Sequence, residues 1–268
     1  LTQEEAEKWE IEEEFLKPAI LKTDTVQIPN LSLNEVDGYF FWCSEKKKKI
    51  KSTKALEYIE WGEKQPIEVK QGKRKGEVLD GYHEVTSVQG RKLWYNIAKR
   101  DPAPVWWMIA HNERSTAFFN NDYICSDNFF EISPNTYSPV SLALYLSSTL
   151  ACLYRELLGR SNFGGGLLKT QKPDLLKFDV LKETFIKNKL NNDLSIAERE
   201  GSSIFEESGI NPESDIPISE QDPEPLPDRA ELDNIVFDAL GLTEEERKEV
   251  YRAVCQLVWN RVNKASSV

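Results

Sequence analysis

The strongest constraint on the fold is residues 139–158, where apolar residues recur every three and four positions. This spacing places them on one side of an α-helix, and Gly159 is a typical residue at a helix C-terminus. The most apolar part, residues 141–154, leads directly into Arg155 and is shorter than the roughly 20 residues that span a bilayer. We therefore expect one long helix buried in the core of a globular protein.

Residues 25–135 have a different pattern, in which short aromatic and β-branched runs alternate with turn-forming pairs such as Asp37-Gly38. This alternation predicts short β-strands joined by turns. Within it, residues 52–61 have apolar positions at helical spacing after the capping candidates Ser52 and Thr53, so we expect a short helix there. The predicted strands are residues 38–43, 93–95, 105–109, 117–119 and 129–132.

The C-terminal part begins with an acidic, proline-containing segment, residues 191–228, which is typical of a linker or a disordered loop. Residues 229–263 then show two apolar helical faces, separated at Gly241 and followed by a capping pattern from Thr243 to Glu246. Together the segments predict an α+β fold. It would combine a twisted, mostly antiparallel, β-rich domain, one long buried helix and a C-terminal helical hairpin.

We expect four parts along the chain. Residues 1–15 would be a helix linking this region to a missing N-terminal domain, because the sequence starts within a helical pattern and without Met. Residues 16–190 would form the main domain, residues 191–228 an acidic linker or loop, and residues 229–268 the helical hairpin.

Charge is distributed unevenly along the chain, whose formal net charge is -11. Residues 1–15 carry a net charge of -6 and residues 191–268 a net charge of -11, whereas residues 16–125 and 126–190 carry +4 and +2. Nucleic-acid binding needs a local positive face and does not need a basic chain. Residues 16–190 therefore permit contact with DNA, and the acidic ends disfavour it.

Four cysteines are spread through the sequence without a CxxC pair or a histidine at zinc-ligand spacing. We expect free thiols in a reducing compartment and no metal site. The acidic start does not resemble a signal peptide, and no run is long enough to span a bilayer. These features predict a cytoplasmic protein without a membrane partner.

Catalytic patterns are weak. The glycine run before Lys169 is not a phosphate-binding loop, because Leu168 stands where that loop requires glycine. Glu68 and Lys70 have the spacing of a metal-dependent nuclease, with Asp37 as a second carboxylate, but so short a match often arises by chance.

Basic clusters lie in the middle of the chain among tryptophans and tyrosines, a composition typical of nucleic-acid-binding surfaces. The same clusters also fit an ordinary solvated surface, and this alternative is strongest for residues 46–49. They are residues 46–49, 73–75, 91–92 and 99–100.

Several stretches, taken in order, resemble the C-terminal target-recognition region of restriction–modification adenine-N6 DNA methyltransferases. The resemblance extends over nearly the whole chain and depends on the shared order more than on any single motif. The stretches are Phe15-Leu16-Lys17-Pro18-Ala19-Ile20, residues 56–63, Gly90-Arg91-Lys92-Leu93-Trp94-Tyr95, residues 160–169 and residues 230–242.

The resemblance implies a division of labour. A missing upstream domain of the same parent chain would bind S-adenosylmethionine and hold the flipped adenine, while residues 16–190 would read double-stranded DNA. This agrees with two absences, because the sequence has no glycine-rich cofactor loop after a strand and no (Asn/Asp/Ser)-Pro-Pro-(Tyr/Phe) tetrapeptide. We therefore expect no catalytic residue and no cofactor in this chain.

The expected DNA contacts combine the basic clusters with loops around residues 86–116 and 160–172. Arg91, Lys92 and Trp94 match the Gly-Arg-x-x-Trp-Tyr stretch of the family, and Arg114 and Arg160 are inferred from their placement. The full set is Lys46, Lys47, Lys73, Arg74, Arg91, Lys92, Trp94, Lys99, Arg114, Arg160, Asn162 and Lys169.

Two other functions fit the sequence less well. The acidic tail and the helical hairpin suit a protein-interaction module that docks a partner subunit. A metal-dependent nuclease would use Asp37, Glu68 and Lys70.

Overall fold

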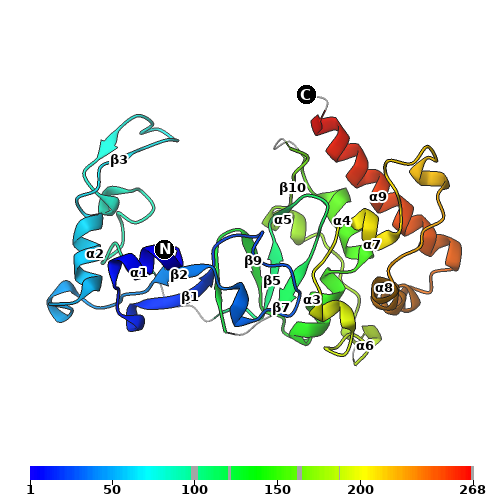
Figure 1. Cartoon of the computed structure of the whole chain (residues 1–268), viewed down its shortest axis with the longest axis horizontal. Helices are drawn as coiled ribbons and strands as arrows, with labels where there is room; N and C mark the ends of the chain where they lie inside the picture. The colour runs from blue at the N-terminus through cyan, green and yellow to red at the C-terminus, as the bar shows by residue number, and fades with distance from the viewer. Residues whose placement is uncertain (98–101, 120–121, 162–164, 187, 267–268) are drawn as a thin grey trace. The chain divides into compact units, whose positions relative to one another are not determined.

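The computed structural model of the chain describes residues 1–97, 102–119, 122–161, 165–186 and 188–266 (Figure 1). The chain divides into two compact units. Unit 1 comprises Leu1–Leu21 and Val36–Asp101, and unit 2 comprises Lys22–Glu35 and Pro102–Val268. The sequence predicts one main domain over residues 16–190. The division into two units places residues from both units within that range.

Unit 1 contains an antiparallel pair of strands, in which Leu16 of β1 lies opposite Phe41 of β2. Helix α2 starts at the N-cap Thr53, whose hydroxyl accepts a hydrogen bond from the Leu56 amide at 3.1 Å. The elements are α1 (Gln3–Trp9), η1 (Glu13–Phe15), β1 (Leu16–Ile20), β2 (Gly38–Phe41), η3 (Lys47–Lys49), α2 (Lys54–Gly62), β3 (Ile67–Glu68), β4 (Val78–Leu79) and η4 (Tyr82–Glu84).

The core of unit 1 forms where α2 packs on the chain before and after it. Ala55 and Ile59 of α2 are fully buried and pack with Phe15 and Tyr95. The predicted strand at residues 93–95 is wrong, because these residues lie in a turn. Tyr95 is held there by its hydroxyl, which donates to the Glu45 carbonyl at 2.9 Å.

Unit 2 has a three-stranded antiparallel sheet in the order β7-β5-β9, with Trp107 of β5 opposite Ala117 and Phe130. A second antiparallel pair joins β6 to β10. The strands are β5 (Val105–Met108), β6 (Ala110–His111), β7 (Ala117–Phe119), β8 (Ile124–Cys125), β9 (Phe129–Ile132) and β10 (Leu168–Lys169). The antiparallel pairings in both units confirm the predicted α+β class.

The predicted helix over residues 139–158 is divided into α3 (Pro139–Leu146) and α4 (Thr149–Leu158). The Ser148 hydroxyl caps α4 by accepting from the Ala151 amide at 3.2 Å. The Ser147 hydroxyl bonds both the amide and the carbonyl of Ala117 on β7. The prediction of one continuous helix is therefore wrong. The helix is interrupted at Ser147 and Ser148, and hydrogen bonds to residues distant in sequence replace those that a continuous helix would make there.

The two predicted C-terminal helices are present as α8 (Pro227–Leu240) and α9 (Glu244–Ser266), separated at Gly241, but α9 packs chiefly against α4 and does not pair along α8 as a hairpin. Residues 191–228 contain the short helix α7 and contribute the buried side chains Ile204, Phe205 and Ile218 to the core under α9. The remaining short elements of unit 2 are η2 (Leu33–Glu35), α5 (Lys172–Leu175), α6 (Glu183–Ile186), η5 (Ser195–Glu198), α7 (Ile204–Ser208) and η6 (Ile218–Glu220). In the described part of the chain, no helix has the length and apolar character needed to cross a membrane.

Candidate nucleic-acid interface

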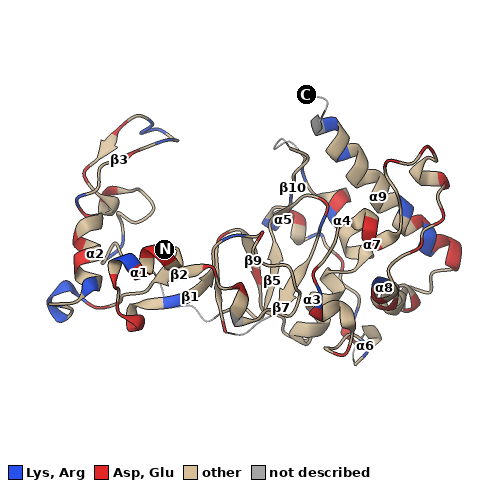
Figure 2. Ribbon diagram, in the orientation of Figure 1, with Lys and Arg blue, Asp and Glu red and all other residues tan. Residues whose placement is uncertain are grey.

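The lysine run of unit 1 forms the turn η3, shown in blue near α2 in Figure 2. Lys46, Lys48 and Lys49 are exposed, and Lys49 lies 2.8 Å from the Glu45 carboxylate. Lys47 is less accessible and forms an ion pair with Glu63. Of the two lysines predicted to contact DNA here, Lys46 therefore presents its charge to solvent, and Lys47 shares its charge with a carboxylate.

A second basic group lies in the turn between β3 and β4. Lys73 is exposed, whereas the Arg74 guanidinium donates to the Glu77 carboxylate at 2.6 Å. Gly72 and Gly76 have φ values of 83° and 90°, which glycine adopts without strain, and they shape this turn. Figure 2 shows blue at the end of this hairpin, away from the body of α2.

Arg91, Lys92 and Trp94 come from the irregular segment after η4. Arg91 and Lys92 are exposed, and one Arg91 nitrogen donates to the Asn96 carbonyl at 3.2 Å. The Trp94 indole donates to Glu63 at 2.9 Å. Burial alone would raise the pKa of Glu63, but its hydrogen bonds from Lys47 and Trp94 hold that pKa below the usual value. Glu63 is therefore a fixed anion that orients both predicted DNA-binding residues.

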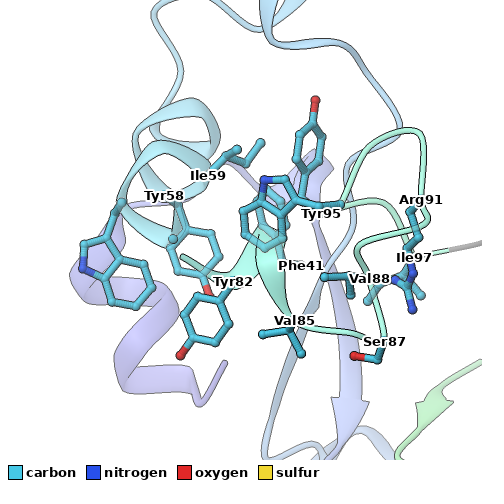
Figure 3. A pocket seen from close by; sticks show the side chains of 13 residues that line it. Phe41, Tyr58, Ile59, Tyr82, Val85, Ser87, Val88, Arg91, Tyr95 and Ile97 are labelled. Atoms are coloured by element: carbon cyan, nitrogen blue, oxygen red, sulfur yellow. The ribbon is translucent and has the colours of Figure 1, made fainter. Parts of the chain in front are cut away.

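Trp94 and Arg91 also line a cavity of about 330 Å³ in unit 1 (Figure 3). In this view Tyr58 and Tyr82 lie toward one side and Arg91 and Ile97 toward the other, with Phe41 between them. We call it the aromatic cavity. Its lining is Phe41, Tyr58, Ile59, Trp61, Gly62, Tyr82, Val85, Ser87, Val88, Arg91, Trp94, Tyr95 and Ile97.

In unit 2, the pairing of β6 with β10 brings two of the expected recognition loops together. Leu168 lies opposite His111, and the Asn112 side chain donates to the Gly165 carbonyl at 3.3 Å. The Arg261 guanidinium, from α9, donates to the carbonyl of Asn112 at 2.8 Å and to the carbonyl of Gly166. One buried arginine thus fixes both loops to the same helix.

The predicted residues of these loops differ in what they contact. Arg114 is half-buried and donates to the Val26 carbonyl at 3.0 Å and to the Gln27 side chain, and burial lowers its pKa. Arg160 has half of its side chain exposed and lies 3.5 Å from Asp174. Lys169 is partly exposed on β10. The predicted residues Lys99 and Asn162 lie outside the described residues.

A polar cleft of about 480 Å³ opens where the β6 loop meets the segments 23–27 and 201–203. Its polar lining includes carboxylates, amides and hydroxyls next to the Arg114 guanidinium. Such groups can donate to and accept from base edges. The cleft is lined by Thr23, Asp24, Gln27, Asn112, Glu113 and Arg114, among others.

Sequence reasoning missed the buried arginines of unit 2. Arg155 is fully buried, lies 4.5 Å from the centroid of the Trp107 ring and donates to the Met108 carbonyl at 2.8 Å. Its neighbour Glu156 accepts two hydrogen bonds from Arg261, at 3.0 and 2.8 Å. The only signal in the sequence was a charged Arg155-Glu156 pair within an apolar helical pattern.

Ligand atoms of His111, Cys152 and Glu156 lie within 4.8 Å of one another, which is a spacing that suits a metal ion. The surrounding charge opposes a cation, because Glu156 is already paired with Arg261. Burial and the positive charges of Arg155 and Arg261 lower the pKa of His111 to about 3. We interpret the group as part of the buried ion network.

The three residues of the nuclease pattern lie in two separate places in unit 1. The Asp37 carboxylate accepts a hydrogen bond from the Leu21 amide at 2.5 Å, just before β2. Glu68 is exposed on β3, and Lys70 follows it, in a hairpin that Figure 1 places apart from β2. The described residues therefore provide no convergent pair of carboxylates from this pattern.

Comparisons with known proteins give a fold and no family. No family model matches the chain, and no curated protein matches its sequence. Its fold is similar to part of the crystal structure of the type IIG restriction endonuclease BpuSI, with a TM-score of 0.58 and 16% identity. The match covers 98% of this chain and 28% of that chain, so this chain spans little more than a quarter of the restriction endonuclease. The chain therefore has a fold that occurs within a restriction endonuclease.

Proposed function

We propose that this chain is the DNA target-recognition region of a site-specific adenine-N6 DNA methyltransferase in a restriction–modification system. The observation that carries the proposal is the fold likeness to a restriction endonuclease along 98% of the chain. In this proposal the chain binds double-stranded DNA and contributes no catalytic residue. An N-terminal domain of the same parent protein would bind S-adenosylmethionine and act on the adenine.

The distribution of accessible charge supports different roles for the two units. Within unit 1, residues 36–101 carry 15 Lys and Arg against 10 Asp and Glu, a net charge of +5, and the two Lys and seven Glu of residues 1–21 offset it. The positive charge is therefore local to residues 36–101. Exposed cations such as Lys46, Lys73 and Lys92 suit sequence-independent contacts with phosphates. The polar cleft of unit 2 offers hydrogen-bonding groups from loops that Arg261 holds in place, which suits base readout.

Binding of the 268-residue chain to a fluorescently labelled duplex tests the proposal. We expect the apparent affinity to fall steeply when salt is raised from 50 to 200 mM, because phosphate contacts release counterions. Lys46→Gln and Lys73→Gln should each weaken binding uniformly across sequences and lower the salt slope by about 1. The matched control is Lys248→Gln on α9, because Lys248 is paired with Asp222 within the acidic C-terminal part.

Selection of bound duplexes from a random library tests the role in recognition. We expect a defined sequence to be enriched, and Arg160→Ala to change the enriched sequence or relax one position of it. Absence of duplex binding at 50 mM salt, or binding that is independent of salt, would refute the proposal. If no sequence is enriched, the proposal of DNA binding stands and the proposal of target recognition is rejected.

A further inference from the structure

The aromatic cavity of unit 1 has the size and lining of a ligand site. Its volume of about 330 Å³ is at the lower end of the range for small-molecule sites, roughly 300–1,000 Å³, which suits a single ring system. Six of its lining side chains are aromatic, and they come from β2, α2, η4 and the turn after η4. Ring contacts connect them in series, from Trp61 to Tyr82, to Trp94 and to Tyr95.

The orientation of two rings favours a planar ligand. The rings of Tyr82 and Trp94 are nearly parallel, with an interplanar angle of 10° and centroids 6.4 Å apart. The two rings therefore form a stack, and one flat molecule can extend it on an open ring face. Tyr82 is 43% exposed, so this aromatic surface is open to solvent. Gly62 maintains the arrangement, because a Cβ atom there would lie 2.8 Å from the Trp94 ring.

The charge at the cavity favours an anionic group on the ligand. Arg91 lines the cavity and is exposed, Lys92 is exposed beside it, and the Ser87 hydroxyl lies in the same lining (Figure 3). Aromatic sites can also bind ammonium groups, through the attraction between a cation and the ring faces. Here the guanidinium in the lining would repel a cationic ligand. The nearby carboxylate of Glu63 is already bonded to Lys47 and Trp94.

We propose that the aromatic cavity binds the base of a nucleotide that is not stacked in a duplex, with its phosphate on Arg91 and Lys92. A nucleotide combines a planar ring with an anionic group, which is the combination that this cavity fits. Base stacking on aromatic side chains tolerates any base and depends on access to the base face. The inference rests on the proposed function, since DNA is the natural source of such a nucleotide.

Anisotropy titrations of a labelled 15-nucleotide single strand test the site. Tyr82→Ala should weaken binding about 5- to 150-fold, which is the range for loss of one stacked base. Tyr82→Phe should retain the affinity, because it keeps the ring. Arg91→Ala should also weaken binding and lower the salt slope, with partial recovery in Arg91→Lys. Phe185→Ala is the matched control, because Phe185 is a 50% exposed aromatic residue of unit 2.

Two further ligands identify the source of the nucleotide. If millimolar dAMP displaces the strand, a free nucleotide suffices, and if it does not, the site needs a nucleotide within a strand. Both results support the inference. Replacing the bases by abasic residues should reduce affinity at least as much as Tyr82→Ala does, and should have a smaller effect in that variant.

The inference is overturned if folded Tyr82→Ala and Arg91→Ala bind the strand and dAMP as the unmodified chain does. It is also overturned if neither ligand binds, or if the cavity takes only an apolar peptide. Duplex binding by the same variants separates the two proposals. Salt-dependent duplex binding that Tyr82→Ala leaves unchanged supports the proposed function alone, whereas strand binding without duplex binding supports the cavity site alone.

Discussion

The two units place their charged groups in opposite ways. Among the described residues, every buried charged side chain belongs to unit 2, including Arg155, Glu207, Arg229 and Asp233. Unit 1 has a core of aliphatic and aromatic side chains, with its cations mostly at the surface. Buried ions require partners in fixed positions, whereas exposed lysines remain mobile and hydrated.

This difference indicates different uses of the same residue types. In unit 2 the arginines connect segments that are distant in sequence, as Arg261 connects α9 to two loops. In unit 1 lysines such as Lys46 and Lys73 are exposed, and the proposed phosphate contacts use them. Replacing a buried arginine should therefore change folding, and replacing an exposed lysine should change binding with little effect on stability.

The largest effect is expected for Arg229→Leu in unit 2. Arg229 donates to the Ser147 carbonyl at 2.6 Å and to Glu207 at 3.0 Å. Its removal leaves the buried carboxylate of Asp233 without this cation, while Glu207 keeps its pair with Arg199. Loss of one partner of a buried ion pair costs about 3–5 kcal/mol. Urea unfolding followed by circular dichroism measures the loss. Lys248→Gln, at an exposed ion pair, should change stability little, and equal losses for the two variants would contradict the comparison.

A smaller effect is expected from pH, through His111. Burial and the charges of Arg155 and Arg261 lower its pKa from 6.5 to about 3 in the folded state. Between these values the unfolded chain binds the proton more readily, so stability falls as the pH falls below 6.5. The loss between pH 6.5 and 4.5 should be roughly 2–3 kcal/mol.

Urea unfolding at pH 6.5, 5.5 and 4.5 measures this dependence. The His111→Gln variant has no titrating imidazole, so its stability should vary less over this range, whatever its stability at pH 6.5. An unchanged slope in His111→Gln would show that other groups of the chain produce the pH dependence.

In unit 1 we expect stability to depend on the packing of aromatic side chains, as it depends on buried charges in unit 2. Gly62→Ala adds a Cβ atom 2.8 Å from the Trp94 ring and 3.6 Å from Tyr82. Displacing the ring should cost about 1–3 kcal/mol by overpacking, and should weaken strand binding at the aromatic cavity. Gly90→Ala is the matched control, because nothing lies within 4 Å of its added Cβ atom. A stability loss of the same size at both glycines would refute this explanation.

Local patterns in the sequence predicted much of the fold. Alternating aromatic runs predicted the strands of the β7-β5-β9 sheet, and two apolar helical faces predicted α8 and α9. The break between α3 and α4 was not predicted, because Ser147 bonds to β7 and Thr149 bonds to Asp233 on α8. Such partners are up to 84 residues away and leave no periodic signal.

The candidate site was harder to predict than the fold. Composition identifies Arg114 and Lys46 equally as cations, but Arg114 is committed to Val26 and Gln27, while Lys46 is exposed. The sequence did not predict the aromatic cavity, although its tryptophans and tyrosines were noted among the basic clusters. Its lining residues lie between positions 41 and 97. Which of their side chains line the cavity depends on tertiary packing, which the local sequence pattern does not show.

The smallest effect is expected where the two units use the same local interaction. Ser148→Ala in unit 2 and Thr53→Ala in unit 1 each remove a helix N-cap hydrogen bond, of 3.2 Å and 3.1 Å respectively. Each should cost about 1 kcal/mol, because the bond that is lost joins residues of one helical turn. Urea unfolding of the two variants under identical conditions makes the comparison. A loss near 1 kcal/mol in both would show that the two units differ in stability effects only at the long-range ion network of unit 2. A much larger loss for Ser148→Ala would instead show that burial strengthens local hydrogen bonds in unit 2 as well.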